Sequence, residues 1–366
     1  MAPPMPLPER PGRAAAARLG GLLWPVLALG GLLGFNALGT AGFFEMRWQE
    51  GNLYGAVIDV LKNGSLVMLL SLGMTLVIAT GGVDLSVGAL MAISGAVAAG
   101  LIEQAGTAGA QAGGATALCV AVCAASVGVC LAAGAANGLL VAVFRVQPLV
   151  ATLVLMVAGR GAAMLITQGR RITIVERFAL YEPFVFIGNG FLFYLPLAVT
   201  IVAVMLLATG LLTRKTALGM FIESVGDNDT ASRYSGVNAA AVKFAAYTFS
   251  GLCAGLAGLI YASNIRTADA SQAGLFLELD AIMAVVIGGT SLMGGRFCLL
   301  GSIAGALLIQ TLTTTMLMHG LSTDQALVPK ALVVVAVCLL QSPEFRRRVG
   351  RLGGRAGRLA GRKGAA

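Results

Sequence analysis

Few residues of this sequence have types and spacings that could do chemistry, and those few lie in apolar surroundings. Asp84 follows Gly81 and Gly82 and precedes Ser86 within the run TLVIATGGVDLSVGAL. A charged group in hydrocarbon costs about 2.5–3.5 kcal/mol on insertion scales, so it requires a polar or wet environment. Glycines that break a helix before an acid expose backbone groups that can coordinate a ligand or shape a pore. An acid that only caps the following helix fits the same pattern, and the two roles can coexist.

Two further polar residues interrupt apolar runs. Asn137 fits either a hydrogen bond between helices or a position on a solute path, so Asp84, Ser86 and Asn137 are the candidate path residues. Arg160 lies between two glycines, which leave room around its guanidinium. We expect Arg160 to pair with a helix C-terminus or with an acid such as Asp84 or Asp280.

Gly81, Gly82 and Arg160 are accordingly interpreted as structural or gating residues inside the membrane. Glu278 and Asp280 are expected to face the outside, at the outer end of a membrane span.

The sequence contains no constellation typical of catalysis or metal binding. A phosphate-binding GxxxxGK[ST] loop is absent, so the chain cannot hydrolyse ATP by that route. The GxSxG and HExxH motifs are absent too. The six cysteines form no CxxC pair, and His319 is the only histidine. We therefore predict no catalytic residue, no metal site and no cofactor in this chain.

The composition predicts a bundle of membrane helices. Hydrophobic residues make up 57% of the 366 residues and charged residues only 11%, whereas about 25% is typical of soluble chains. The 50 glycines include small-xxx-small pairs, which let helices approach closely. These pairs are Gly134 with Gly138, Gly251 with Gly255, and Gly301 with Gly305.

Ten apolar stretches approach the length of about 20 residues that a membrane span needs, so the predicted fold is an all-α polytopic bundle. They are 19–40, 62–80, 85–103, 115–143, 149–168, 191–213, 243–263, 278–292, 298–318 and 326–341. The first follows three arginines and fits an uncleaved signal-anchor better than a secretory signal. The expected organisation is an N-terminal tail (1–18), a transmembrane domain (19–342) and a basic C-terminal tail (343–366).

The distribution of basic residues predicts that both termini are cytoplasmic. The tail from Glu344 to Ala366 has eight basic residues and one acid, a net +7 of the total +9. With the N-terminus inside, nine other basic residues join the eight tail residues on the cytoplasmic side, against six outside. We expect the tail to attract anionic membrane lipid. Binding of nucleic acid is the less favoured alternative, because only Phe345 accompanies the tail as an aromatic residue.

The segment 214–242 is the only long inner connection. It is charged and helix-capable, and Gly226-Asp227-Asn228 supplies a turn signal. The pattern fits equally a helix-turn-helix that docks a peripheral partner and a solvated connector. Polar outer segments are expected at 41–61, 169–190 and 264–277.

Four stretches resemble the permease subunits of bacterial ABC sugar importers, a family that includes the ribose, xylose and galactofuranose systems. The first runs from Gly73 to Gly88 and contains the break at Asp84. The others are QPLVATLVLMVAGRG (147–161), LLTRKTALGMFIESVG (211–226) and LELDAIMAVVIGGTSLMGGRF (277–297). The resemblance covers about residues 50–342 and is greatest to the galactofuranose-type permeases.

This resemblance implies one subunit of a larger machine in the bacterial inner membrane. A periplasmic protein delivers the sugar to two permease subunits, identical or distinct, and ATP-binding subunits drive the switch from the cytoplasm. Segment 214–242 then matches the coupling element that faces the ATPase. The residues implied in coupling are Gly219, Phe221, Glu223, Gly226, Ala231, Ser235 and Gly236. An ATP-independent secondary transporter or channel is the alternative, and a membrane-embedded enzyme is a more distant one.

Overall fold

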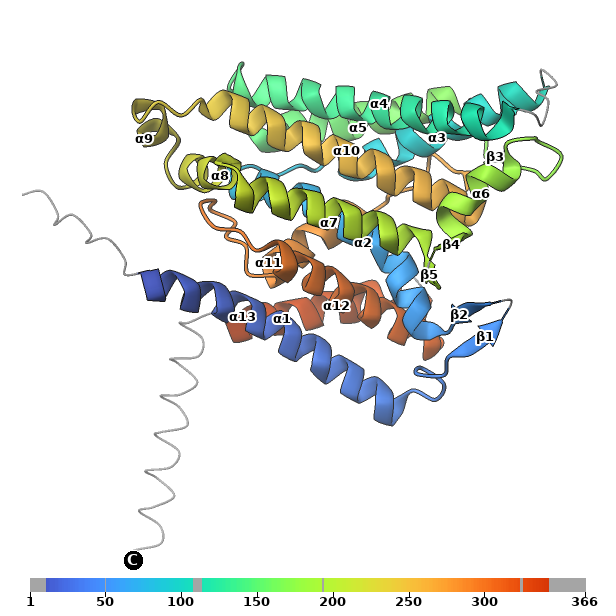
Figure 1. Ribbon diagram of the computed structural model, residues 1–366, viewed down its shortest axis with the longest axis horizontal. Helices are drawn as coiled ribbons and strands as arrows, with labels where there is room; N and C mark the ends of the chain where they lie inside the picture. Colours follow the sequence, from blue (N-terminus) through green and yellow to red (C-terminus); the bar gives the residue numbers. More distant parts are fainter. Residues whose placement is uncertain (1–10, 50, 108–113, 193, 323–324, 342–366) are drawn as a thin grey trace, which may run out of the picture.

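The computed structural model describes residues 11–49, 51–107, 114–192, 194–322 and 325–341. Long helices run side by side in one bundle (Figure 1). The helices are α1 (Pro11–Gly39), α2 (Ala56–Ala79), α3 (Val87–Thr107), α4 (Ala115–Ala142), α5 (Pro148–Ile166), α6 (Tyr181–Asn189), α7 (Leu197–Lys215), α8 (Leu218–Asp227), α9 (Asp229–Tyr234), α10 (Ala239–Ile265), α11 (Leu277–Ile287), α12 (Leu299–Met318) and α13 (Leu327–Gln341). The predicted all-α polytopic bundle is confirmed.

Eight helices among the described residues are long and apolar enough to cross a membrane, against ten predicted spans. The other two expected spans correspond to α11, of 11 residues, and α13, of 15 residues. At 1.5 Å per residue α11 is about 16 Å long, roughly half the hydrocarbon thickness. It ends early because Gly288 follows it and Gly289 takes a positive φ of 83°. The candidate stretch 278–292, already short in the sequence, thus forms a helix too short to cross the hydrocarbon layer.

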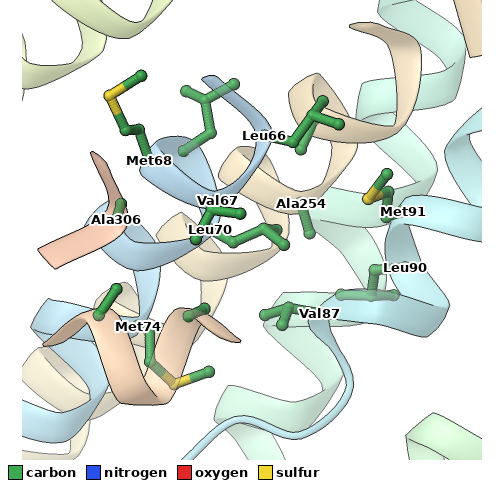
Figure 2. Packing of buried hydrophobic residues seen from close by; sticks show 14 of the residues in the cluster. Leu66, Val67, Met68, Leu70, Met74, Val87, Leu90, Met91, Ala254 and Ala306 are labelled. Atoms are coloured by element: carbon green, nitrogen blue, oxygen red, sulfur yellow. The ribbon is translucent and has the colours of Figure 1, made fainter. Parts of the chain in front are cut away.

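α2 lies at the centre of the bundle. It contacts α10 on one side and α11 and α12 on another, with α7 alongside. Figure 2 shows the side chains of α2 facing those of α3, α10 and α12. Residues buried on all sides of a helix predict a helix enclosed by others rather than one facing lipid.

Two of the predicted glycine pairs bring α4 and α10 into backbone contact. A Cβ built on Gly134 would lie 2.9 Å from the Cα of Gly251, and one on Gly251 would lie 2.5 Å from the Cys130 carbonyl oxygen. The third pair lies between α11 and α12, where a Cβ on Gly305 would lie 2.2 Å from the Ala284 carbonyl oxygen. Larger residues would push these helices apart, so the small side chains set their spacing.

Three small antiparallel sheets lie at the end of the bundle opposite α8 and α9 (Figure 1). They pair β1 (Arg47–Gln49) with β2 (Asn52–Tyr54), β3 (Ile172–Thr173) with β6 (Thr267–Ala268), and β4 (Phe191–Leu192) with β5 (Leu195–Pro196). Aromatic contacts join the first sheet to the third, with ring centroids 5.4 Å apart for Trp48 and Tyr194. Most of these strands lie in the polar segments 41–61, 169–190 and 264–277, and the sequence prediction missed them because they are only two or three residues long.

The first helix belongs to the bundle. α1 packs against α12, where Asn36 of α1 is buried and donates to the Thr315 hydroxyl at 2.8 Å. It begins at Pro11, eight residues before the predicted span. The predicted tail 343–366 lies outside the described residues, as do residues 1–10 of the predicted tail 1–18.

Candidate functional site

The link between α2 and α3 is the break that the two glycines predicted. Gly81 has a φ of 80°, a left-handed conformation that glycine adopts without steric cost. At Gly82 an added Cβ would lie 2.4 Å from the hydroxyl oxygen of Tyr247 on α10. Both glycines are thus required locally, one for the turn and one for the close approach of α10.

Asp84 is the centre of a fully buried polar cluster. Its Oδ1 accepts hydrogen bonds from the backbone nitrogen and hydroxyl of Ser86, at 3.0 and 2.6 Å. Its Oδ2 accepts from the Ser250 hydroxyl of α10 at 2.8 Å. Asn137 of α4 donates from Nδ2 to the Ser86 hydroxyl at 3.0 Å. We call Asp84, Ser86, Asn137 and Ser250 the break cluster.

The break cluster ties the start of α3 to α4 and α10. Three of its members are the candidate path residues, and Asp84, Ser86 and Asn137 have side chains at most 1% exposed. The carboxylate also satisfies a backbone N–H just before α3, which is the capping arrangement. Ser250 was missed because a single serine beside Gly251 in an apolar helix carries no distinctive spacing.

One acceptor of the break cluster remains unused. The Oδ1 of Asn137 is buried and has no hydrogen-bond partner within the described part of the chain. A buried acceptor without a partner costs about 1–3 kcal/mol. The present conformation is therefore unfavourable for Asn137, whose Oδ1 is free to accept a hydrogen bond from a donor.

Arg160 of α5 binds the segment that precedes α11. Its Nη1 donates to the carbonyl oxygens of Ala270 and Ala273, in the turn segment between β6 and α11. Asp84 and Asp280, the two acids suggested as partners, are bound by serines and by Lys330 instead. The acid that interacts electrostatically with Arg160 is Glu278. The spacing of residues in the sequence cannot reveal the two carbonyl acceptors.

Glu278 and Asp280 are buried, contrary to the expectation of external exposure. Asp280 of α11 forms an ion pair with Lys330 of α13, with 2.9 Å between Oδ2 and Nζ. The Oε2 of Glu278 has no hydrogen-bond partner among the residues that the structure describes. Because α11 is short, these acids lie inside the bundle, covered by neighbouring helices.

The predicted coupling segment forms a helix-turn-helix at the end of the bundle that also carries the α11–α12 link (Figure 1). α8 and α9 meet at Asn228, whose Oδ1 accepts from the backbone nitrogen of Ala231 at 2.9 Å and caps α9. The hydroxyls of Ser224 and Ser232 bond at 2.7 Å across the turn. This mutual bonding makes the two short helices one unit.

α8 is attached to the bundle through backbone contacts at its glycines. A Cβ built on Gly226 would lie 1.9 Å from the carbonyl oxygen of Ala79 and 2.4 Å from the nitrogen of Gly295. Gly295 itself donates to the Ala79 carbonyl at 3.0 Å. At Gly219 an added Cβ would lie 2.1 Å from the Thr213 carbonyl oxygen. The end of α8 therefore touches the end of α2 immediately before the break.

The remaining coupling residues divide between interior and surface. Phe221 is partly buried and packs against the hydrophobic cluster that contains Ile222 and Val225. Glu223 is also partly buried, whereas Ala231, Ser235 and Gly236 are exposed.

Large apolar side chains at this end are exposed as well. Met220 is 64% exposed, Tyr234 is 89% exposed, and Met293 of the α11–α12 link is 89% exposed. Exposed apolar groups among polar ones are typical of a surface that binds another protein. The sequence prediction did not single out these three residues, because their exposure depends on how α8 and the link pack.

α9 is further held by charges. Asp229 accepts from Arg233 at 2.8 Å and from Lys243 of α10 at 2.9 Å. The hydrogen bond from Arg233, together with Lys243, lowers the pKa of Asp229 below its usual value.

The described residues contain no group of three or more histidine, cysteine or acidic side chains that could hold a metal ion.

A bundle of long apolar helices with a short helix-turn-helix at one end is the architecture of a polytopic membrane protein. The comparisons with known proteins agree with this class. Residues 56–340 match the family described as the permease component of the branched-chain amino acid transport system. The chain belongs to this permease family.

Curated relatives of the chain are sugar import permeases. It is 47% identical over 327 residues to the galactofuranose transporter permease protein YtfT of Escherichia coli (strain K12), covering 88% of this chain and 91% of the relative. It is 37% identical to the fructose import permease protein FruF of Bifidobacterium longum (strain NCC 2705), covering 88% of each. The ribose import permease protein RbsC of Escherichia coli (strain K12) is 36% identical, with coverage of 78% and 85%.

The resemblance to ABC sugar importer permeases, most of all to the galactofuranose type, is thereby confirmed. No solved structure matches the chain.

Proposed function

We propose that this chain is a permease subunit of an ABC importer that carries a monosaccharide across the bacterial inner membrane. Relatives named as galactofuranose, fructose and ribose permeases support the sugar class. Pentoses, hexopyranoses and hexofuranoses present the same uncharged hydroxyl groups, so the class rather than one sugar is proposed. A second permease subunit, identical or distinct, completes the path.

The observation that carries the proposal is the contact of α8 with the break. Through Gly226, the exposed helix-turn-helix touches both the end of α2 and the α11–α12 link. A partner that moved α8 would push directly on the backbone next to Gly81 and Asp84. Such an arrangement can convert movement of a peripheral subunit into a change of the bundle, as a two-state element biased from one side.

The partner on this face is an ATP-binding subunit, and ATP itself is bound there rather than by this chain. The exposed Met220, Tyr234 and Met293 supply an apolar surface for it. The first residues of α1 and the last residues of α13 lie at the same end of the bundle as α8 and α9 (Figure 1). Together with the basic residues at this end, this supports a cytoplasmic location for both termini. A periplasmic sugar-binding protein then docks at the end that carries the small sheets.

The break cluster is closed to solvent in this conformation, so the path role of Asp84, Ser86 and Asn137 belongs to a different state of the bundle. Displacement of α8 would release the α2–α3 link and expose hydroxyl and amide groups that bind a sugar weakly. The unused Oδ1 of Asn137 supports this role, because it can accept from a sugar hydroxyl. Weak polar binding permits rapid release, which a transporter requires.

Co-purification with an ATP-binding subunit tests the docking surface. The chain with a Met220→Ser and Tyr234→Ser double substitution should lose most of the bound ATPase. A control carries Val204→Ser and Leu207→Ser, which are 58% and 65% exposed on α7 and lie more than two helical turns before α8 begins. Equal recovery of the ATPase by both variants would contradict the proposal.

The alternative function is an ATP-independent secondary transporter or channel. Sugar uptake by vesicles that contain this chain alone, unchanged by nucleotide, would establish it. Vesicles that also contain the ATPase, a second permease subunit and a binding protein, tested with a panel of labelled sugars, identify the substrate.

A further inference from the structure

A cavity of about 540 Å³ lies beside the docking segment, distinct from the break cluster. Its wall is formed by the end of α4, the link from α4 to α5, both ends of α9 and the beginning of α10. The residues that matter for its chemistry are Arg145, Pro148, Asp229, Arg233, Tyr234 and Lys243. The volume suits a group larger than a single ion.

The charge of the cavity favours an anion. Three cationic side chains and one carboxylate line it, which gives a formal net charge of +2. Asp229 is engaged by Arg233 and Lys243 at once. Arg145 is exposed and forms no ion pair within the part of the chain that the structure describes. Arginine presents several parallel N–H donors, which match the oxygens of a phosphate group.

The cavity opens where the apolar surface of the bundle ends. Val143 and Phe144 immediately precede Arg145, and Leu149 and Val150 follow Pro148, and all four are exposed. Val143 and Phe144 lie in the α4–α5 link, and Leu149 and Val150 lie in the first turn of α5. Both α4 and α5 are covered little by other helices. A basic pocket at such a boundary lies at the depth of lipid headgroups.

We propose that this cavity binds the phosphate group of an anionic phospholipid of the inner leaflet, whose acyl chains lie along α4 and α5. This inference rests on the proposed cytoplasmic location of α8 and α9. A bound headgroup would bridge Arg145 of the α4–α5 link to Arg233 and Lys243 beside α9. Lipid would thereby brace the docking segment against the bundle.

Lipid binding to the delipidated full chain, measured by native mass spectrometry, tests the proposal. The probes are phosphatidylglycerol, phosphatidylcholine and glycerol 1-phosphate. Each basic residue near an anionic surface contributes on the order of fivefold in affinity. We expect phosphatidylglycerol to bind at least fivefold more tightly than phosphatidylcholine, and Arg145→Gln to weaken it about fivefold. Arg214→Gln is the matched control, because Arg214 is an exposed arginine at the same end that does not line the cavity.

Three results would overturn the lipid site: equal binding of both lipids, no effect of Arg145→Gln, or an equal loss in the Arg214→Gln control. Glycerol 1-phosphate binding as tightly as phosphatidylglycerol would assign the cavity to a soluble phosphate instead. Displacement of the lipid by the ATPase subunit would show that the cavity binds that protein rather than lipid. None of these measurements involves transport, so failure of the lipid proposal can be told apart from failure of the proposed sugar transport. Labelling of Tyr234→Cys by an impermeant thiol reagent, from one side of the membrane at a time, tests the orientation separately.

Discussion

Gly226 is the residue at which α8 contacts the end of α2, just before the break. Because Gly226 has no side chain, the Ala79 carbonyl oxygen and the Gly295 nitrogen can lie close to its Cα. A methyl group there would have to displace backbone on both neighbours. Gly226 thus links the exposed helix-turn-helix of α8 and α9 to the end of α2, which leads to the break cluster.

Gly226→Ala should therefore uncouple ATP hydrolysis from transport. We expect sugar uptake by the reconstituted complex to fall at least tenfold, because α8 no longer seats against α2. Gly210→Ala on α7 is the control, since no atom lies within 4 Å of the added Cβ there. Normal uptake by Gly226→Ala would show that this contact does not transmit the movement.

Ser250 supports the break cluster from α10. Ser250→Ala removes one of the three hydrogen bonds to the buried Asp84 carboxylate and should cost about 1–3 kcal/mol of stability. Thermal unfolding in detergent measures the loss. Thr248→Ala, in the same helix, removes only a bond to the backbone of α10 and should cost less. A larger loss in the Thr248 variant would contradict the role of the cluster.

α11 and α13 form an element pair joined by the ion pair of Asp280 and Lys330. Removing one partner of a buried pair leaves an uncompensated charge, which costs about 3–5 kcal/mol. Lys330→Met alone should therefore reduce thermal stability strongly. The double variant Lys330→Met with Asp280→Leu should recover most of it, because an apolar pair can replace a buried ion pair. No recovery would mean that Lys330 acts through packing rather than charge.

α9 depends on Asp229 for its attachment to α10. The pKa of this carboxylate is lowered, so its contribution to stability is present above the usual value of about 3.9 and is lost as the pH falls through the lowered pKa. A spin label at Ser235→Cys should show constant mobility from pH 8 to pH 5 and greater mobility below about pH 4. In an Asp229→Asn background the label should be mobile throughout. A transition above pH 5 would contradict this assignment.

The sequence predicted the bundle well because membrane spans follow from composition and length alone. It also predicted the break at Gly81 and Gly82, and the helix-turn-helix at 214–242 was one of two interpretations that the pattern left equally open. Three of the four residues of the break cluster were named from the sequence, and Ser250 was missed because it joins Asp84 only through tertiary packing of α10. The partners of Arg160 and the burial of Glu278 and Asp280 could not be predicted, because α11 is too short to place these acids at an outer surface.

As a whole molecule, the chain places the proposed docking surface at one end and small sheets at the other, with α2 between them. The surface carries exposed apolar groups, and the centre is packed by glycines and apolar side chains. A movement of α8 would reach the break directly, because Gly226 of α8 contacts the backbone of Ala79 at the end of α2. We therefore expect transport to require an external source of energy at the α8–α9 face.

Uptake of labelled sugar by sealed vesicles tests this requirement most directly. The vesicles contain the chain with its permease partner, the ATPase subunits and the binding protein, and ATP is either supplied or withheld. We predict accumulation of sugar against its gradient only when ATP is present, and none when the ATPase is omitted. Accumulation at the same rate without nucleotide and without the ATPase would contradict the central claim.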